Sequence, residues 1–288
     1  MTTVWTGLAI GAIYSFIAIG YNVVLLASGV FNFAHAQFVM LGTFTAYVGL
    51  VVFDLHVALA VLFGAVVVGI VGVLEERIAI RPLIAKADIA VMVIATIGAG
   101  TLISGAVAKI WGTDPKVVPG QFSNKPIHIF GGTVQPNDLA LIIMVLAIGI
   151  GLQVWSRSTR FGLASLASAE NRRAAMLKGI NIKAMSIAAF ALAGIIAGLA
   201  GVLLGPRTYA VSYLGDQLAL YGFVAIAIGG AGNQLGGLFG GFTVGLLFAF
   251  SERYMGGGYP EIMVLLLFLL ILLIRPQGLF GRPLERVV

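Results

Sequence analysis

The sequence predicts an all-α polytopic membrane protein. Of its 288 residues, 60% are hydrophobic and only 10% are charged, and the mean hydropathy is +1.06. A water-soluble domain could not hide so much apolar surface inside one core. Long uncharged stretches alternate with short charged segments, as in helices that cross a bilayer repeatedly. We expect one membrane domain over residues 1–288 with about eight or nine transmembrane segments, some of them interrupted or re-entrant.

Basic residues gather in segments that we expect on one side of the membrane. Twelve of the 17 Lys and Arg residues lie in residues 75–88, 156–184 and 275–288. Cytoplasmic segments carry an excess of Lys and Arg, so the sequence predicts a cytoplasmic C-terminus and an N-terminus outside. Contact with membrane lipid accounts for the net charge of +6, and no nucleic acid partner is needed to explain it.

The first 53 residues contain no charged side chain. A single helix of that length would be about 80 Å long, whereas the hydrocarbon core of a bilayer is about 30 Å thick. The stretch must therefore fold back, and we place the break at residues 28–35 (SGVFNFAH), where Gly29 and Asn32 favour the end of one helix and the start of another. Because no basic residue precedes it, the first apolar run is predicted to be a retained span rather than a signal peptide.

Further crossings follow in order along the middle of the chain. A polar turn at Asp54 and His56 precedes an inward crossing over residues 57–74, and the next crossings are expected at residues 89–111, 139–155 and 185–205. The loop at residues 112–138 is rich in Pro, Gly and Asn, and is expected outside without regular structure.

The loop at residues 156–184 carries six basic residues and one acid, Glu170. Within it, Ser165 to Lys178 is rich in Ala, Leu and Arg and is predicted to form one short helix that Gly179 terminates. A small helix held at the membrane face is typical of a docking element.

A second uncharged run, residues 217–251, is too long for one span and short for two. If residues 206–216 and 252–258 both lie outside, the run enters and leaves on the same face as a hairpin or a re-entrant pair. Its glycine cluster, residues 229–237, includes Asn233 and Gln234, whose amides would be costly in hydrocarbon. The cluster therefore predicts either unwound backbone at a polar path or a cytoplasmic turn, and a last span is expected at residues 259–274.

The residues that energised transport or catalysis requires are missing. Away from the ends of the spans, no charged residue lies inside an expected crossing, although proton-coupled carriers need one. The chain has no GxxxxGK[ST] loop and no cysteine, and His35, His56 and His128 lie in different elements. We expect no catalytic residue, no metal site and no cofactor in this chain, which is therefore not predicted to be an enzyme. An energised transporter would require a partner ATPase.

Several stretches resemble the permease subunits of branched-chain amino acid ABC importers of the LivH type. They are residues 29–35 (GVFNFAH) with the following Gly42, residues 169–181 (AENRRAAMLKGIN), residues 228–237 (IGGAGNQLGG) and the tail at 275–282 (RPQGLFGR). The similarity covers nearly the whole chain in order. It implies a type II ABC importer-like fold in the inner membrane of a bacterium, a second homologous permease subunit, two cytoplasmic ATPase subunits that bind ATP and Mg²⁺, and an extracytoplasmic solute-binding protein.

The resemblance also implies a function for particular residues. In such permeases the loop corresponding to Glu170 to Gly179 is a coupling helix seated on the ATPase. We therefore expect coupling roles for five residues there: Glu170, Asn171, Arg172, Arg173 and Gly179. The alternative for the two arginines is that they anchor the loop to anionic headgroups. ATP-driven closure of the partner would pull on this helix and switch a path between outside-open and inside-open states.

Five polar residues are candidates for the substrate path, namely Asn22, Asn32, His35, Asn233 and Gln234. Asn32 has the alternative role of an N-cap, and His35 that of a satisfied polar helix end. The predicted substrate is leucine, isoleucine or valine, with urea, short amides and other amino acids as alternatives, since Gln37 and Lys178 depart from the family pattern. A passive channel for a small neutral solute is the alternative of another class.

Overall fold

The computed structural model describes residues 1–83, 89–123 and 125–281. Lys86 of the expected basic segment and Arg282 of the tail lie outside the described residues. The helices are α1 (Thr2–Ser28), α2 (His35–Tyr47), α3 (Val57–Glu75), α4 (Ile89–Trp111), α5 (Pro136–Ser158), α6 (Arg160–Glu170), α7 (Arg172–Leu177), α8 (Ile182–Thr208), α9 (Leu214–Gly229), α10 (Gln234–Met255) and α11 (Pro260–Ile274), and short π-helical turns extend α2 through Val48–Val52 and α3 through Glu76–Ile80.

The predicted class of all-α membrane protein is confirmed. Seven helical segments in the described ranges are long and apolar enough to cross a membrane, and α9 and α11 are shorter apolar helices. The crossings predicted at residues 89–111, 139–155, 185–205 and 259–274 correspond to α4, α5, α8 and α11. The uncharged run at residues 217–251 forms α9 and α10, separated by a turn, as a hairpin or re-entrant pair requires.

The chain forms two compact units. Unit 1 comprises Met1–Asn22, Ser123–Gln153 and Leu220–Val288, and unit 2 comprises Val23–Phe122 and Val154–Ala219. Unit 1 therefore contains most of α1, α5, α10 and α11, whereas unit 2 contains α2, α3, α4, α6, α7 and α8.

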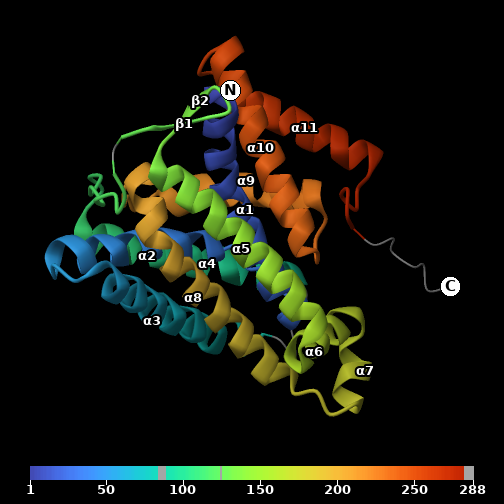
Figure 1. Ribbon diagram of the computed structural model, residues 1–288. Coiled ribbons are helices and arrows are strands. Elements are labelled where there is room, and N and C mark those ends of the chain that lie inside the picture. Colours follow the sequence, from blue (N-terminus) through green and yellow to red (C-terminus); the bar gives the residue numbers. More distant parts are fainter. Residues whose placement is uncertain (84–88, 124, 282–288) are drawn as a thin grey trace. The chain divides into compact units, whose positions relative to one another are not determined.

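Close packing at glycines builds the core of unit 2. Helix α3 lies alongside α8, and α2 packs against both (Figure 1). A Cβ atom on Gly198 of α8 would overlap the backbone of Gly64 in α3, and one on Gly201 would overlap Gly42 in α2. Since lipid removes the hydrophobic force between helices, such small residues let the backbones approach and gain dispersion contacts.

The helices of unit 1 also pack closely at glycines, and the unit contains a β-hairpin. A Cβ atom on Gly245 of α10 would overlap Gly11 of α1, and the Ser15 hydroxyl donates to the Leu238 carbonyl at 2.8 Å. The loop at residues 112–138, predicted to lack regular structure, contains the antiparallel strands β1 (Ile127–Ile129) and β2 (Gly132–Val134). That part of the loop prediction is wrong, because the turn at residues 130–131 supports pairing of the two strands.

The single helix predicted over Ser165 to Lys178 is also wrong. The chain breaks at Asn171, whose φ of −150° is extended, and α6 and α7 lie on either side. The Asn171 Oδ1 atom accepts a hydrogen bond of 3.0 Å from the Ala174 backbone and so caps α7. An asparagine favours this N-cap geometry over a continuous helix. The predicted stop is confirmed, since Gly179 follows α7 with a φ of +84°.

Candidate transport and coupling sites

The first interruption in the membrane helices lies where the sequence predicts it. Helix α1 ends at Ser28, Gly29 has a φ of +69°, and α2 begins at His35. Asn32 lies fully buried between the helices. Its Nδ2 atom donates to Glu75 Oε2 at 3.1 Å, and its Oδ1 atom accepts from the backbone of Ala34 at 2.9 Å. The Asn32 amide therefore joins the interruption to the end of α3.

The partner of Asn32 is a carboxylate inside a spanning segment. Glu75 is 6% exposed, and in the described part of the chain its Oε1 atom has no hydrogen-bond partner. His35, three residues after Asn32, is also fully buried, and its ring makes a T-shaped contact with Phe38 at a centroid distance of 5.9 Å. Ionisable groups within spanning segments are costly and are retained mostly for function.

Arg172, the first residue of α7, reaches the same interruption. Its Nη1 atom donates to the Ser28 carbonyl at 3.1 Å, at the last turn of α1. A cation there interacts favourably with the negative end of the helix dipole. Burial lowers the pKa of the Arg172 guanidinium from its ordinary value, although an arginine stays charged. Arg173, the next residue, is exposed, so the two arginines predicted to act together have different surroundings.

The exposed face of α7 is apolar and basic. Leu177 is 89% exposed and Met176 is 51% exposed, beside the exposed Arg173 and Lys178. Glu170 is exposed at the end of α6. A large apolar side chain held outward on a short capped helix is suited to a protein partner.

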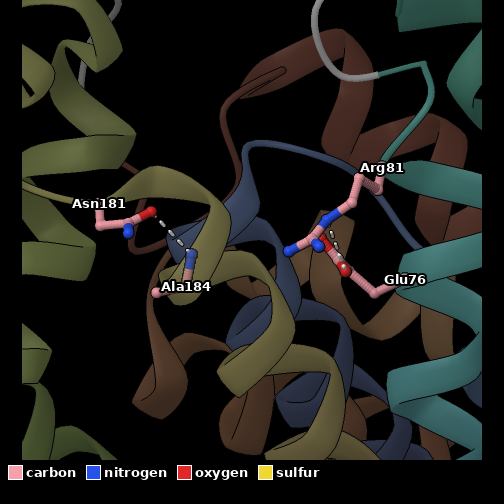
Figure 2. Close-up of polar contacts among 4 residues, drawn as sticks. All are labelled: Glu76, Arg81, Asn181 and Ala184. Atoms are coloured by element: carbon pink, nitrogen blue, oxygen red, sulfur yellow. Dashed lines mark hydrogen bonds and ion pairs between the residues drawn. The ribbon is translucent and has the colours of Figure 1, made fainter.

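The basic ends of two spans lie together in unit 2. The π-helical turn after α3, which carries Arg77, packs against α8 near its start. Figure 2 shows Arg81 turned back toward the buried Glu76 carboxylate, with 3.6 Å between nitrogen and oxygen. It also shows the Asn181 Oδ1 atom accepting from the Ala184 backbone at 3.1 Å, which caps α8. The basic segments before α4 and before α8 therefore share one end of the unit.

The second interruption, in unit 1, is held in part by amide side chains that bond to its backbone. Helix α9 ends at Gly229 and α10 begins at Gln234. The Asn22 Oδ1 atom accepts from the Gly232 backbone at 2.6 Å, and its Nδ2 atom donates to the Asn233 carbonyl at 2.9 Å. Asn233 caps α10 by accepting from the Gly236 backbone at 3.2 Å. Both ends of the Asn22 amide are therefore used to hold the turn.

The C-terminal tail completes this second interruption. The backbone of Leu279 donates to the Ile228 carbonyl at 2.8 Å, and that of Phe280 donates to the Gly229 carbonyl at 3.0 Å. These bonds satisfy carbonyls that the end of α9 would otherwise leave open. Gln234 is 3% exposed, and its Oε1 atom has no hydrogen-bond partner in the described ranges.

The five residues predicted for the path fall into two groups. Asn22, Asn233 and Gln234 belong to unit 1, and Asn32 and His35 belong to unit 2. Asn32 forms hydrogen bonds at the first interruption, and Asn22 and Asn233 form them at the second. Within the described ranges, no group of three or more His, Cys, Asp and Glu side chains could hold a metal ion.

Two polar pairs in the structure were not predicted from the sequence. Glu75 appeared only as the boundary of a basic segment, and Asp216 only as part of an outside loop, although it bonds to Gln37 of α2. The sequence does contain a signal for Asp216. The uncharged run that follows it, residues 217–251, is too short for two full spans. One of the two helices in this run is therefore expected to begin within the membrane.

Several apolar spans and two interrupted helix pairs are typical of polytopic membrane transport subunits. The chain belongs to the family described as branched-chain amino acid transport system permease component, whose sequence model matches residues 3–275. The high-affinity branched-chain amino acid transport system permease protein LivH of Escherichia coli K12 is 28% identical over 97% of this chain and 94% of its own length. BraD of Pseudomonas aeruginosa, a permease protein of the same description, is 29% identical over 96% and 94%.

A solved structure shares the fold. A chain of PsaBC from Streptococcus pneumoniae, in complex with Fab, superposes with a TM-score of 0.50 at 13% identity and covers 96% of this chain and 93% of that chain. The predicted family is therefore confirmed by sequence, and the architecture by structure.

Proposed function

We propose that this chain is the permease subunit of an ATP-driven importer for leucine, isoleucine, valine or closely similar amino acids. The observation that carries the proposal is the family match over residues 3–275, together with relatives described as branched-chain amino acid permeases. The partners would be a second homologous permease, two cytoplasmic ATPase subunits that bind ATP and Mg²⁺, and an extracytoplasmic solute-binding protein. Family membership favours this function over urea or amide transport and over a passive channel.

The proposed orientation follows from the basic residues. The segments before α4 and α8 lie at one end of unit 2, and the positive-inside rule assigns that end to the cytoplasm. With this orientation α6 and α7 face the cytoplasm. The alternation of uncharged runs and basic segments along the chain supports the further proposal that the loop at residues 112–138 and the N-terminus lie outside an inner membrane.

In the proposed coupling, neighbouring residues of α7 have different roles. Leu177 and Arg173, on the exposed face of α7, would contact the ATPase, while Arg172 would pass the movement of α7 to the end of α1. Glu170, Asn171 and Gly179 would fix the position of α7, since Asn171 caps it and Gly179 ends it. Asn32 would carry the movement further to α3 through Glu75.

Leu177→Glu tests the docking part of the proposal. The change places a charge on an 89% exposed apolar position and should abolish co-purification of the ATPase subunits from mild detergent, along with ATP-dependent leucine uptake. Phe130→Glu is the matched control, because Phe130 is 85% exposed in the hairpin expected outside and should leave co-purification intact. A wild-type chain that binds no ATPase and passes solute without ATP would instead establish a channel.

A further inference from the structure

Asp216 is an exposed carboxylate placed against the spanning helices of unit 2. Its Oδ1 atom accepts a hydrogen bond of 2.6 Å from Gln37 Nε2. Gln37 is only 4% exposed and belongs to the first turn of α2. The hydrogen bond brings Asp216 to α2, although it lies in the segment 206–216 that would be outside if the following run entered and left on the same face.

The packing of α2 on α3 gives the depth of this pair. Phe38, the residue after Gln37, packs on Gly72 of α3. The span that contains Gly72 runs over Val57–Ile80. At about 1.5 Å per residue, Gly72 is about 22 Å from the first residue of the span and about 12 Å from the last. Asp216 therefore lies level with the interior of a spanning helix rather than with its outer end.

Helix α4 leads to a similar depth. A Cβ atom on Gly100 would lie 3.4 Å from Gln37 Cγ, and the span that contains Gly100 runs over Ala90–Trp111. Gly100 is about 15 Å from the first residue of that span and about 17 Å from the last. Helix α9 has 16 residues and is about 24 Å long, shorter than a hydrocarbon core of about 30 Å, as expected of a helix that begins within the membrane.

An exposed carboxylate at this depth does not face hydrocarbon. Charged side chains within the bilayer are costly, and almost all of them face the interior of a bundle or a water-filled cavity. Asp216 is exposed, whereas Gln37, which holds it, is buried. The exposed side of Asp216 therefore marks a polar surface inside the membrane.

The exposed member of the pair, Asp216, offers hydrogen-bond acceptors to a ligand. Gln37 Oε1 is buried, and among the described residues it has no hydrogen-bond partner. It lies against Gly215, where a Cβ atom would overlap the Gln37 amide. An ionised carboxylate also only accepts hydrogen bonds, whereas an ammonium group has three to donate. Charge and hydrogen bonding are thus both complementary to an amine cation.

We propose that Asp216, positioned by Gln37, lines the translocation path and binds the α-ammonium group of the amino acid as it passes. The identity of this ligand rests on the proposed function, whereas the place of Asp216 on a polar path does not. Binding of the ammonium group to one carboxylate orients the zwitterion, so that its apolar side chain contacts other residues that line the path.

Thiol accessibility tests the location. The chain has no cysteine, so Asp216→Cys introduces a single thiol. A charged, membrane-impermeant methanethiosulfonate should modify it in vesicles that contain the assembled transporter, and leucine should slow the reaction. Ile70→Cys is the matched control, since Ile70 is 54% exposed on α3, two residues from Gly72, and a thiolate does not form in hydrocarbon. Absence of modification at position 216, or equal modification at both positions, would overturn the location.

Charge substitution tests the ligand. Asp216→Asn should lower ATP-dependent leucine uptake about tenfold or more, because hydrogen bonds to charged groups are strong. Asp216→Glu should restore part of the uptake, and both variants should still bind the ATPase subunits. Asp54→Asn is the control, because Asp54 is an exposed turn residue with a φ of 48°, which asparagine tolerates.

The two experiments separate this inference from the proposed function. Unchanged uptake by Asp216→Asn would overturn the ammonium role even though the importer works. A wild-type chain without ATP-dependent amino acid uptake would overturn both the proposed function and the ammonium role, while the thiol experiment would still decide whether Asp216 lines a polar path.

Discussion

The two interruptions of the membrane helices differ in what holds them. Between α1 and α2, side chains make the joint, because Asn32 bonds to Glu75 and Arg172 bonds to the end of α1. Between α9 and α10, backbone contributes more. Gly229 packs on Gly236, and the carbonyls at the end of α9 bond to the tail, while Asn22 adds side-chain bonds from α1.

This difference indicates different mobility. A joint made of side chains can exchange partners while both helices keep their own hydrogen bonds, whereas a joint made of interlocked backbone cannot move without losing its packing. The first joint is also the one that Arg172 of α7, the proposed coupling helix, contacts. We therefore expect the α1–α2 joint to change during transport and the α9–α10 joint to stay fixed.

Gly229→Val should have the largest effect. A Cβ atom at Gly229 would overlap the Gly236 carbonyl, and neither backbone can give way, so we expect a loss of stability of about 3 kcal/mol or more. The measurement is thermal unfolding of the purified chain in detergent. Gly29→Asn in the first joint is the control, because its φ of +69° suits asparagine and the nearest atom to a new Cβ is 3.9 Å away. Equal losses at both glycines would contradict the comparison.

Asn32→Ala should have an intermediate effect. It leaves the buried Glu75 carboxylate without its amide partner, at a cost of about 1–3 kcal/mol. Adding Glu75→Leu removes the unpaired group, so the double variant should be more stable than the sum of the single changes predicts. Thermal unfolding of all four forms completes a double-mutant cycle. Additivity within about 0.5 kcal/mol would show that the pair does not hold the joint.

Arg172→Ala should have the smallest effect on stability, about 1 kcal/mol or less. Its expected effect is on coupling: the ATPase subunits should still co-purify, but ATP hydrolysis should no longer drive leucine uptake. Arg173→Ala, the exposed neighbour, should instead weaken co-purification. If Arg172→Ala weakened co-purification and Arg173→Ala uncoupled ATP hydrolysis from uptake, the hydrogen bond between Arg172 and Ser28 would have no part in coupling.

Hydropathy and turn residues were enough to predict the class of fold and most helix boundaries. Gly29, the polar turn at Asp54 and His56, and Gly179 each end an element as expected. The reason is that these signals are local, since a glycine with positive φ or an uncharged run acts through its own segment. A prediction from the average composition of a segment fails at Asn171. The composition of its neighbours favours one continuous helix, whereas the Asn171 side chain caps the start of α7 and so divides the segment.

The polar pairs could not be predicted, because their partners are far apart in the chain. Asn32 and Glu75 are 43 residues apart, and Gln37 and Asp216 are 179 apart. Hydropathy periodicity reports which face of a helix is apolar and contains no information on which side chains meet. The candidate path residues were therefore chosen by polarity alone, and the structure adds that the asparagines among them hold the joints.

The tail contacts have a consequence for biosynthesis. Unit 1 takes its parts from the first, a middle and the last portion of the chain. Its interruption between α9 and α10 bonds both to Asn22 and to residues 279–280. Residues 279–280 leave the ribosome after all the described membrane helices, so the interruption stays without these bonds until that point of translation. A chain shortened before Leu279 would insert all its helices and yet expose an unfinished joint to membrane quality control.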